Sequence, residues 1–535
     1  MAEKNYTTAT EHADYVERTL SIDATAGVDE FKNAHALDSI EDTKPGAFVW
    51  LCAAATGIGG MLFGYDTGVI SGVLVVIGKA LDNRPLSSSE KELITALCAA
   101  GALIGAIIAG VTADKFGRKP AIWFASILFT IGAIVQATSY TISQMCVGRV
   151  LIGLGVGSAS TIVPLYIAEI SPARFRGRMI SVDMICLGTG SVLAYAVDAI
   201  FAHVSQGWRY MVGLGAVPSI LLGVFLFWCP ESPRQLIYHN KHEQCVKVVR
   251  QIYVNATEQQ IADKVASIEY GVTQSKTLEE EATIAKALRD LFCVPANLRA
   301  GIAACGLMFF QQFCGFNTLM YFSSTLFDIV GFHNPVAVGT TVACVNWIFT
   351  VLSIFLIDRV GRRRLLLWTM WAMPVCLVVA AIAFHWVPID LHTLQVTNDE
   401  IGWPAYLVLV MMILFVASYA AGLGCVPWQA NEFLPMEVRA MGTMFINIFN
   451  WGPNIVVSST FLTMMKSITP SGTFGFYAGL CFLGWVFVFF CFPEASNMTL
   501  EEVRAVFQHG FGVKYAEEWR KQQKRAKKER EANGV

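Results

Sequence analysis

Charged residues are scarce in this chain, and their scarcity excludes an ordinary soluble domain. Only 15% of its 535 residues are Asp, Glu, Lys or Arg, whereas soluble domains carry about 25%. Hydrophobic residues make up 54% of the chain, and its mean hydropathy is +0.51. This composition predicts a membrane protein that crosses the bilayer many times.

Signatures of enzymes and of nucleotide-driven pumps are also missing from the sequence. We find no metal-site spacing of His, Cys or carboxylates, no nucleophile with a nearby base, and no nucleotide-binding motif. The 14 cysteines lie in apolar segments or in loops predicted to be cytoplasmic, so no disulfide framework is expected. We therefore expect neither an enzyme nor a metal, cofactor or nucleic-acid partner.

What the chain does contain is a series of long apolar segments. About 20 residues cross a bilayer, and runs of this length span lipid as helices because their backbone groups must pair internally. Polar residues 1–46 precede the first run, so no cleavable signal peptide is expected. The twelve predicted spans are 47–77, 92–113, 120–139, 142–164, 179–202, 209–229, 300–325, 336–357, 365–386, 404–427, 441–465 and 474–492.

Positive charge is concentrated in alternate loops between these spans. The loops after the second, fourth and eighth spans are rich in Lys and Arg, whereas those after the third, fifth, seventh and ninth have none. The positive-inside rule then places both termini in the cytoplasm. The charged loop residues are Lys115, Arg118, Lys119, Arg174, Arg176, Arg178, Arg359, Arg362, Arg363 and Arg364.

Three short motifs occur twice, which indicates an internal duplication. Residues 114–119 recur at 358–363, residues 169–176 recur at 432–439, and Pro-Glu at 230–231 recurs at 493–494. The repeat predicts two six-helix halves, whose interface near the membrane midplane holds the substrate site. The predicted divisions are an N-terminal tail 1–46, a first half 47–229, a cytoplasmic helical linker 230–299, a second half 300–492 and a C-terminal tail 493–535.

These motifs resemble the sugar porter family of the major facilitator superfamily over residues 45–500. The sequences Phe-Gly-Tyr-Asp-Thr-Gly at 63–68 and Val-Pro-Trp-Gln at 426–429 are most similar to the fungal proton-coupled myo-inositol (polyol) transporters. The resemblance implies an all-α major facilitator fold of 12 transmembrane helices. It also implies a plasma-membrane monomer that imports myo-inositol with a proton by alternating access. The alternatives are a proton-coupled hexose transporter, a passive sugar facilitator and a transporter-like nutrient sensor.

Asp66 lies in the middle of the first apolar span, where a charge is costly unless compensated. Arg149 lies in the fourth span, and both residues are roughly 10–16 Å from the outer ends of their helices, so they can pair. Burial favours the protonated carboxyl while a neighbouring arginine favours the ionised form, a competition that suits a proton carrier. The alternative is a permanently ionised structural pair. The resemblance favours proton coupling.

Amide side chains in the seventh span suit a ligand with many hydroxyls, because each amide offers donors and an acceptor. The same amides could instead join neighbouring helices, and the resemblance favours the sugar-binding interpretation. Trp428 offers an aromatic face to a sugar ring, although packing is the alternative. Phe316, Tyr321 and Phe322 are expected to pack or to form a gate. The predicted substrate residues are Gln311, Gln312, Asn317, Asn346, Trp428, Asn450 and Trp451.

The duplicated motifs place acidic and basic residues at the cytoplasmic ends of helices in both halves. They are interpreted as a latch that pairs when the inner side is closed and breaks when it opens. The alternative is static glue that also sets the topology. The predicted latch residues are Asp114, Arg118, Glu169, Arg176, Glu231 and Arg234 in the first half, and Asp358, Arg362, Glu432, Arg439 and Glu494 in the second.

The sequence departs from the family pattern at three places. Ser191 stands where the fifth span usually carries Gln, and four residues rather than five separate Trp428 from Glu432. The second half ends in Pro-Glu-Ala-Ser-Asn rather than Pro-Glu-Thr-Lys-Gly, which predicts a weaker latch there. Asp198 is a further candidate polar contact, with a surface carboxylate as the expected interpretation. The basic tail 514–533 is expected to be a solvated helix or disordered.

Overall fold

Helices dominate the computed structural model, which describes residues 40, 46–281, 284–390, 395–396, 402–428, 433–435, 438–495, 498 and 500–532. Within these residues, eleven helices or helix pairs are long and apolar enough to cross a membrane. The 29-residue α19 (Arg439–Ser467) is not among them, since it carries polar residues such as Asn450 and Asn454. It nevertheless lies in the bundle against α3 and α13, where the sequence predicts the eleventh span.

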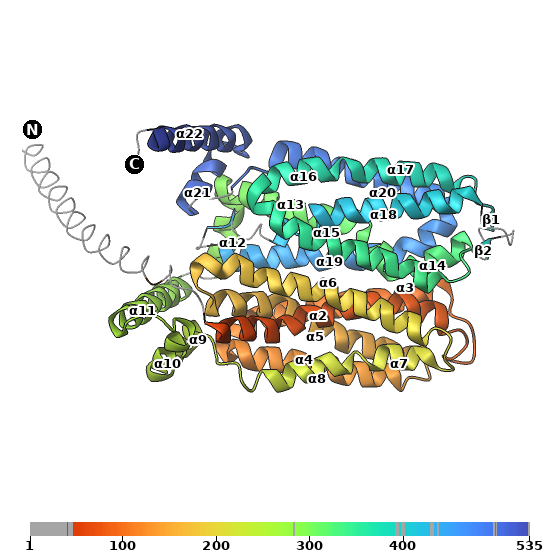
Figure 1. Cartoon of the computed structure of the whole chain (residues 1–535), viewed down its shortest axis with the longest axis horizontal. Coiled ribbons are helices and arrows are strands. Elements are labelled where there is room, and N and C mark those ends of the chain that lie inside the picture. Colours follow the sequence, from red (N-terminus) through yellow and green to blue (C-terminus); the bar gives the residue numbers. More distant parts are fainter. Residues whose placement is uncertain are drawn as a thin grey trace, which may run out of the picture.

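The N-terminal half consists of α2 to α8 and forms the lower part of the bundle in Figure 1. Leu214 and Gly215 separate α7 from α8, which together form one span. Every predicted span of this half has a helical counterpart, although α3 and α5 extend beyond the predicted ends. The helices are α2 (Ala47–Val76), α3 (Ser88–Phe116), α4 (Arg118–Ala137), α5 (Ile142–Ile170), α6 (Arg176–Phe201), α7 (Gly207–Gly213) and α8 (Ala216–Phe225), with the 3-10 turn η1 (Ala173–Phe175) before α6.

The C-terminal half consists of α13 to α20 and forms the upper part of the bundle (Figure 1). Its first predicted span, 300–325, is two helices, because Gly315 adopts a left-handed conformation with φ of +85° between them. The sequence analysis did not predict this break. The helices are α13 (Pro295–Phe313), α14 (Phe316–Val330), α15 (Pro335–Val360), α16 (Arg362–Met370), α17 (Ala372–Phe384), α18 (Trp403–Ala421), α19 and α20 (Thr469–Cys491).

Shorter elements lie at the two ends of the bundle. We call the end that carries α9 to α12 the linker end, and the opposite end, with the small ladder of β1 (Ile389–Asp390) and β2 (Gln395–Val396), the loop end (Figure 1). The basic C-terminal segment forms helix α22 at the linker end, in agreement with the helical alternative. The linker-end helices are α9 (Pro233–Tyr238), α10 (His242–Ile252), α11 (Glu258–Glu281), α12 (Ile284–Cys293), α21 (Leu500–Gln508) and α22 (Val513–Ala532).

Glycines bring α2 and α6 into close contact in the N-terminal half. A side chain on Gly64 would place its Cβ 1.8 Å from the carbonyl oxygen of Leu187, and one on Gly190 would lie 2.1 Å from that of Met61. Such backbone contacts between helices require small residues. They fix the position of α2, and therefore of Asp66, relative to α6.

The two halves meet through α2, α3 and α6 on one side and α14, α15 and α19 on the other. At the loop end the Ser71 hydroxyl lies 3.0 Å from that of Ser323 and donates to that of Ser324 at 2.9 Å. Tyr195 donates to the carbonyl of Met320 at 2.7 Å. These residues are buried, so the interface is tightly closed at this point.

Candidate functional site

Asp66 and Arg149 form an ion pair inside the N-terminal half, at an N–O distance of 2.5 Å. Their side chains are 5% and 1% exposed. The second carboxylate oxygen of Asp66 accepts a hydrogen bond from Cys98 Sγ at 3.0 Å, and Arg149 Nε donates to the Ile94 carbonyl at 3.1 Å. The predicted pairing of the first and fourth spans is therefore present, with α3 contributing two partners.

One nitrogen of the Arg149 guanidinium has no hydrogen-bond partner within the described residues. This atom, Nη2, is buried. A buried donor without a partner costs about 1–3 kcal/mol. The guanidinium can therefore gain a partner if its contact with Asp66 weakens.

Gln312 is the centre of an amide network between α13, α14 and α19. Its Nε2 donates to Asn450 Oδ1 at 2.5 Å. Its Oε1 accepts from Asn317 Nδ2 and, at 3.0 Å, from Asn454 Nδ2. Three of the predicted substrate residues therefore meet, and Asn454 is a fourth member that the sequence analysis missed. The sequence could have indicated Asn454, because it is four residues after Asn450 and therefore lies on the same face of the helix.

Gln311 does not join this network. Its Nε2 donates to the carbonyls of Leu423 and Gly424 at 3.0 and 3.2 Å, just beyond the end of α18. This amide thus joins two helices, as the alternative interpretation anticipated. Gln311 and Gln312 are adjacent in α13, so their side chains point about 100° apart on the helix and contact different neighbours.

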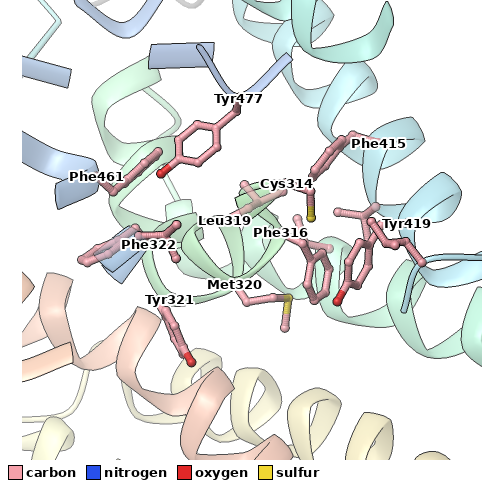
Figure 2. Close-up of a cluster of buried hydrophobic side chains, with 14 of the residues drawn as sticks. Cys314, Phe316, Leu319, Met320, Tyr321, Phe322, Phe415, Tyr419, Phe461 and Tyr477 are labelled. Atoms are coloured by element: carbon pink, nitrogen blue, oxygen red, sulfur yellow. The ribbon is translucent and has the colours of Figure 1, made fainter. Parts of the chain in front are cut away.

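The remaining predicted substrate residues lie near the interface of the halves. Trp451 packs on Phe63 of α2 with ring centroids 5.4 Å apart, so a C-terminal side chain reaches the N-terminal half. Asn346 is buried in α15, and Trp428 is half-buried against a hydrophobic cluster that contains residues of both halves. Phe316, predicted as a packing or gate residue, stacks on Tyr419 at 3.8 Å between centroids, as Figure 2 shows.

Two buried polar atoms at these positions have unused hydrogen-bonding capacity. Gln311 Oε1 and Trp451 Nε1 make no hydrogen bond within the described residues. One is an acceptor and the other a donor, so both match the hydroxyl groups of a neutral polyol. An occupied site would satisfy groups that are otherwise costly to bury.

Predicted latch residues of the N-terminal half form one network at the linker end. Arg118 contacts Asp114 at 2.6 Å and Glu169 at 2.9 Å, and donates to Gln235 of α9 at 2.8 Å. Helix α9 is thereby tied to the bundle.

Glu231 completes this network through the backbone. It accepts hydrogen bonds from the N–H groups of Arg118, Lys119 and Ser232. Burial raises the pKa of the Glu231 carboxyl, although these donors oppose the shift. Arg176 donates to the Ala168 carbonyl at 3.1 Å; Arg234 lies in α9.

In the C-terminal half, Glu494 occupies the place that Glu231 holds in the first half. It accepts from the backbone N–H groups of Arg362 and Arg363 at 3.3 and 3.0 Å. Arg520 of α22 approaches it to 3.8 Å, a contact that the sequence analysis did not foresee. Arg439 Nε donates to the Leu434 carbonyl at 3.1 Å. The Asp358 side chain and the whole of Glu432 lie outside the described part of the chain.

Two aspartates of α6 are buried against glycines of α2. Asp198 is 0% exposed and accepts from the Gly72 N–H at 3.1 Å, so the expected surface carboxylate is wrong: the absence of a side chain on Gly72 makes room for it. Asp183 is also buried, beside Gly60, and was not singled out from the sequence. Ser191 donates to the Gly64 carbonyl at 3.1 Å.

The two-half bundle of membrane-spanning helices, with a buried ion pair in one half and a buried amide network in the other, is the architecture of a membrane transporter. The family of sugar (and other) transporters matches residues 51–507, and the chain belongs to this family. It has the all-α fold of the major facilitator superfamily and is a multi-pass membrane protein.

Several named transporters are similar to this chain. Myo-inositol transporter 2 of Schizosaccharomyces pombe is 44% identical, over 89% of this chain and 84% of that protein. Myo-inositol transporter 1 of Cryptococcus neoformans is 42% identical, over 95% and 90%. Among solved structures, the xylose transporter XylE of E. coli in an inward-open conformation is 26% identical with a TM-score of 0.70, over 86% of this chain and 99% of that one. XylE is described as a proton:xylose symporter in a second similar structure.

Proposed function

We propose that this protein is a proton-coupled symporter that imports myo-inositol or a closely related cyclic polyol. The observation that carries the proposal is the buried Asp66–Arg149 ion pair, whose N–O distance is 2.5 Å. An ionisable pair at such a position is expensive and is typical of proton pathways. Two relatives named myo-inositol transporters, 44% and 42% identical to this chain, support a polyol as the substrate. The similarity to XylE, named a proton:xylose symporter, supports proton coupling.

The substrate binds, in this proposal, between the halves beside the amide network of Gln312. The unused groups of Gln311 and Trp451 contribute one acceptor and one donor, and Asn317, Asn346, Asn450 and Trp428 complete the site. A ring of hydroxyls without charge matches amides and an indole N–H better than it matches charged groups.

Competition uptake in proteoliposomes tests this function. Labelled myo-inositol is offered with glucose, xylose or scyllo-inositol as competitors, with and without an imposed pH gradient. We expect inositol to enter, to be accumulated only with the gradient, and to be displaced best by its stereoisomer. Failure of inositol to enter, or stronger displacement by a hexose, would favour a hexose carrier instead.

The linker-end networks act, we propose, as a latch that breaks when the helix ends within each half shift as the inner side opens. Arg118 joins residues of α3, α5 and α9, so Arg118→Ala removes several contacts together. We expect uptake to fall by about tenfold or more at normal surface expression. Arg250→Ala is the matched control, because the Arg250–Glu258 pair is exposed on the linker helices. Equal uptake by both variants would contradict the latch.

The plasma membrane is the proposed location, with both termini and the linker end in the cytoplasm. The concentration of Lys and Arg at the linker end supports this orientation. We propose the same divisions at 46, 229, 299 and 492, and the support for them is that α2 begins at Ala47, α8 ends at Phe225, α13 begins at Pro295 and α20 ends at Cys491. A monomer suffices in this proposal, since ion pair, amides and latch all come from one chain.

A further inference from the structure

Tyr321 of α14 lies between the substrate network and the ion pair. Its hydroxyl donates to Asn454 Oδ1 at 3.3 Å, and Asn454 in turn holds Gln312 at 3.0 Å. The Tyr321 ring is buried at the interface of the halves. In Figure 2 it points away from the other labelled aromatic rings, toward the pale orange helices of the N-terminal half.

The same hydroxyl is near the proton site. Tyr321 is two residues before Ser323, whose hydroxyl lies 3.0 Å from that of Ser71 in α2, and Asp66 is five residues before Ser71 on the same helix. Asp66, Arg149 and Cys98 also act electrostatically on the Tyr321 hydroxyl. A single side chain of the C-terminal half is therefore close to the amides on one side and to the buried charges on the other. Low dielectric inside the bundle strengthens both interactions.

Arg149 and Tyr321 each have hydrogen-bonding capacity that is not used. Arg149 Nη2 makes no hydrogen bond within the described residues, while the Tyr321 oxygen has lone pairs left after donating to Asn454. When a proton adds to the Asp66 carboxylate, the attraction that holds the guanidinium falls. Arg149 then gains by donating an N–H to a neutral oxygen acceptor such as a hydroxyl.

We propose that Tyr321 is the positioning residue that couples the proton site to the substrate site. Protonation of Asp66 frees Arg149 to donate to Tyr321 Oη, and this bond strengthens the hydrogen bond that Tyr321 already donates to Asn454. The stronger bond fixes the Gln312 amide for the substrate. No proton passes through Tyr321. The proton binds and leaves Asp66, and Tyr321 transmits only the change in the position of Arg149. This inference rests on the proposed symport.

Tyr321→Phe removes the hydroxyl and keeps the ring, so it separates coupling from packing. Two assays are run in the same proteoliposomes: inositol accumulation driven by a pH gradient, and exchange of labelled for unlabelled inositol without a gradient. We expect accumulation to fall by about tenfold or more, while exchange stays close to wild type. The KM for inositol should also lose its dependence on external pH.

Tyr477→Phe is the matched control, because Tyr477 is a buried tyrosine of the same aromatic cluster whose hydroxyl bonds to Thr318 instead (Figure 2). It should leave coupling unchanged. The proposal is overturned if Tyr321→Phe accumulates inositol like wild type, or if the folded variant loses accumulation and exchange equally. Absence of gradient-driven accumulation in the wild type would instead overturn the proposed symport itself.

Discussion

Burial decides what the Asp66–Arg149 pair can do. Removing two charges from water costs several kcal/mol per ion, and their attraction recovers this only with good geometry and further hydrogen bonds. Cys98 and the Ile94 carbonyl supply two such bonds. These bonds stabilise the ionised pair. A proton on Asp66 neutralises the carboxylate, weakens its attraction for Arg149 and allows the guanidinium to bind another acceptor.

Gln312 is the amide on which the other members of its network depend. Gln312→Ala leaves Asn450, Asn317 and Asn454 without their shared partner, so each buried amide loses a hydrogen bond. The expected cost is about 1–3 kcal/mol of substrate binding, which appears as a rise in KM. Uptake kinetics at normal surface expression check this result. An unchanged KM would place the substrate elsewhere.

Part of the site was accessible to sequence reasoning and part was not. Depth counting brought Asp66 to Arg149 because both lie on regular helices with a fixed rise. It carried no information on Gln311, whose contacts with the carbonyls of Leu423 and Gly424 depend on how the end of α18 packs against α13. The burial of Asp198 was also inaccessible, because it depends on how closely α6 approaches Gly72.

The α2–α6 contact is the element on which the position of Asp66 depends most. The two backbones touch at Gly64 and Gly190, where any side chain would overlap a carbonyl oxygen. Hydropathy predicts both helices but carries no information on the distance between them. That distance comes from the glycines and from the Ser191 hydroxyl bond across the contact.

Gly64→Ala should therefore destabilise the protein, because its Cβ would lie 1.8 Å from the Leu187 carbonyl oxygen and must push the helices apart. The expected loss is about 1–3 kcal/mol, seen as a lower melting temperature in detergent. Gly110→Ala is the control, since no atom lies within 4 Å of the added Cβ and alanine favours the helix by up to about 1 kcal/mol. Equal melting temperatures would contradict the close contact.

Transport by alternating access requires the two halves to separate first at one end of the bundle and then at the other. At the loop end the halves are joined by buried hydroxyls of α2, α6 and α14 and by Glu92, which accepts from the Thr463 hydroxyl at 2.6 Å and from its backbone N–H at 2.7 Å. Twelve spans and two halves were predicted from the sequence. The sequence did not predict that the loop end is the closed one. A transporter closed at the loop end and one closed at the linker end consist of the same helices with the same hydropathy.

A crosslink between the halves tests this movement. Ser71 and Ser323 have hydroxyls 3.0 Å apart, so the double variant Ser71→Cys, Ser323→Cys should form a disulfide under mild oxidation. We expect uptake to stop on oxidation and to return with a reducing agent, since the loop end cannot open while crosslinked. Each single variant controls for the native cysteines. Normal uptake by the crosslinked protein would show that these helices need not separate.

The most direct test of proton coupling is Asp66→Asn in proteoliposomes with an imposed pH gradient. Asparagine keeps the shape of Asp66 but cannot bind and release the proton. The account predicts that this variant exchanges inositol but does not accumulate it, whereas Asp263→Asn, on the exposed face of linker helix α11, accumulates it like wild type. If Asp66→Asn still concentrates inositol against its gradient, Asp66 is not the proton site.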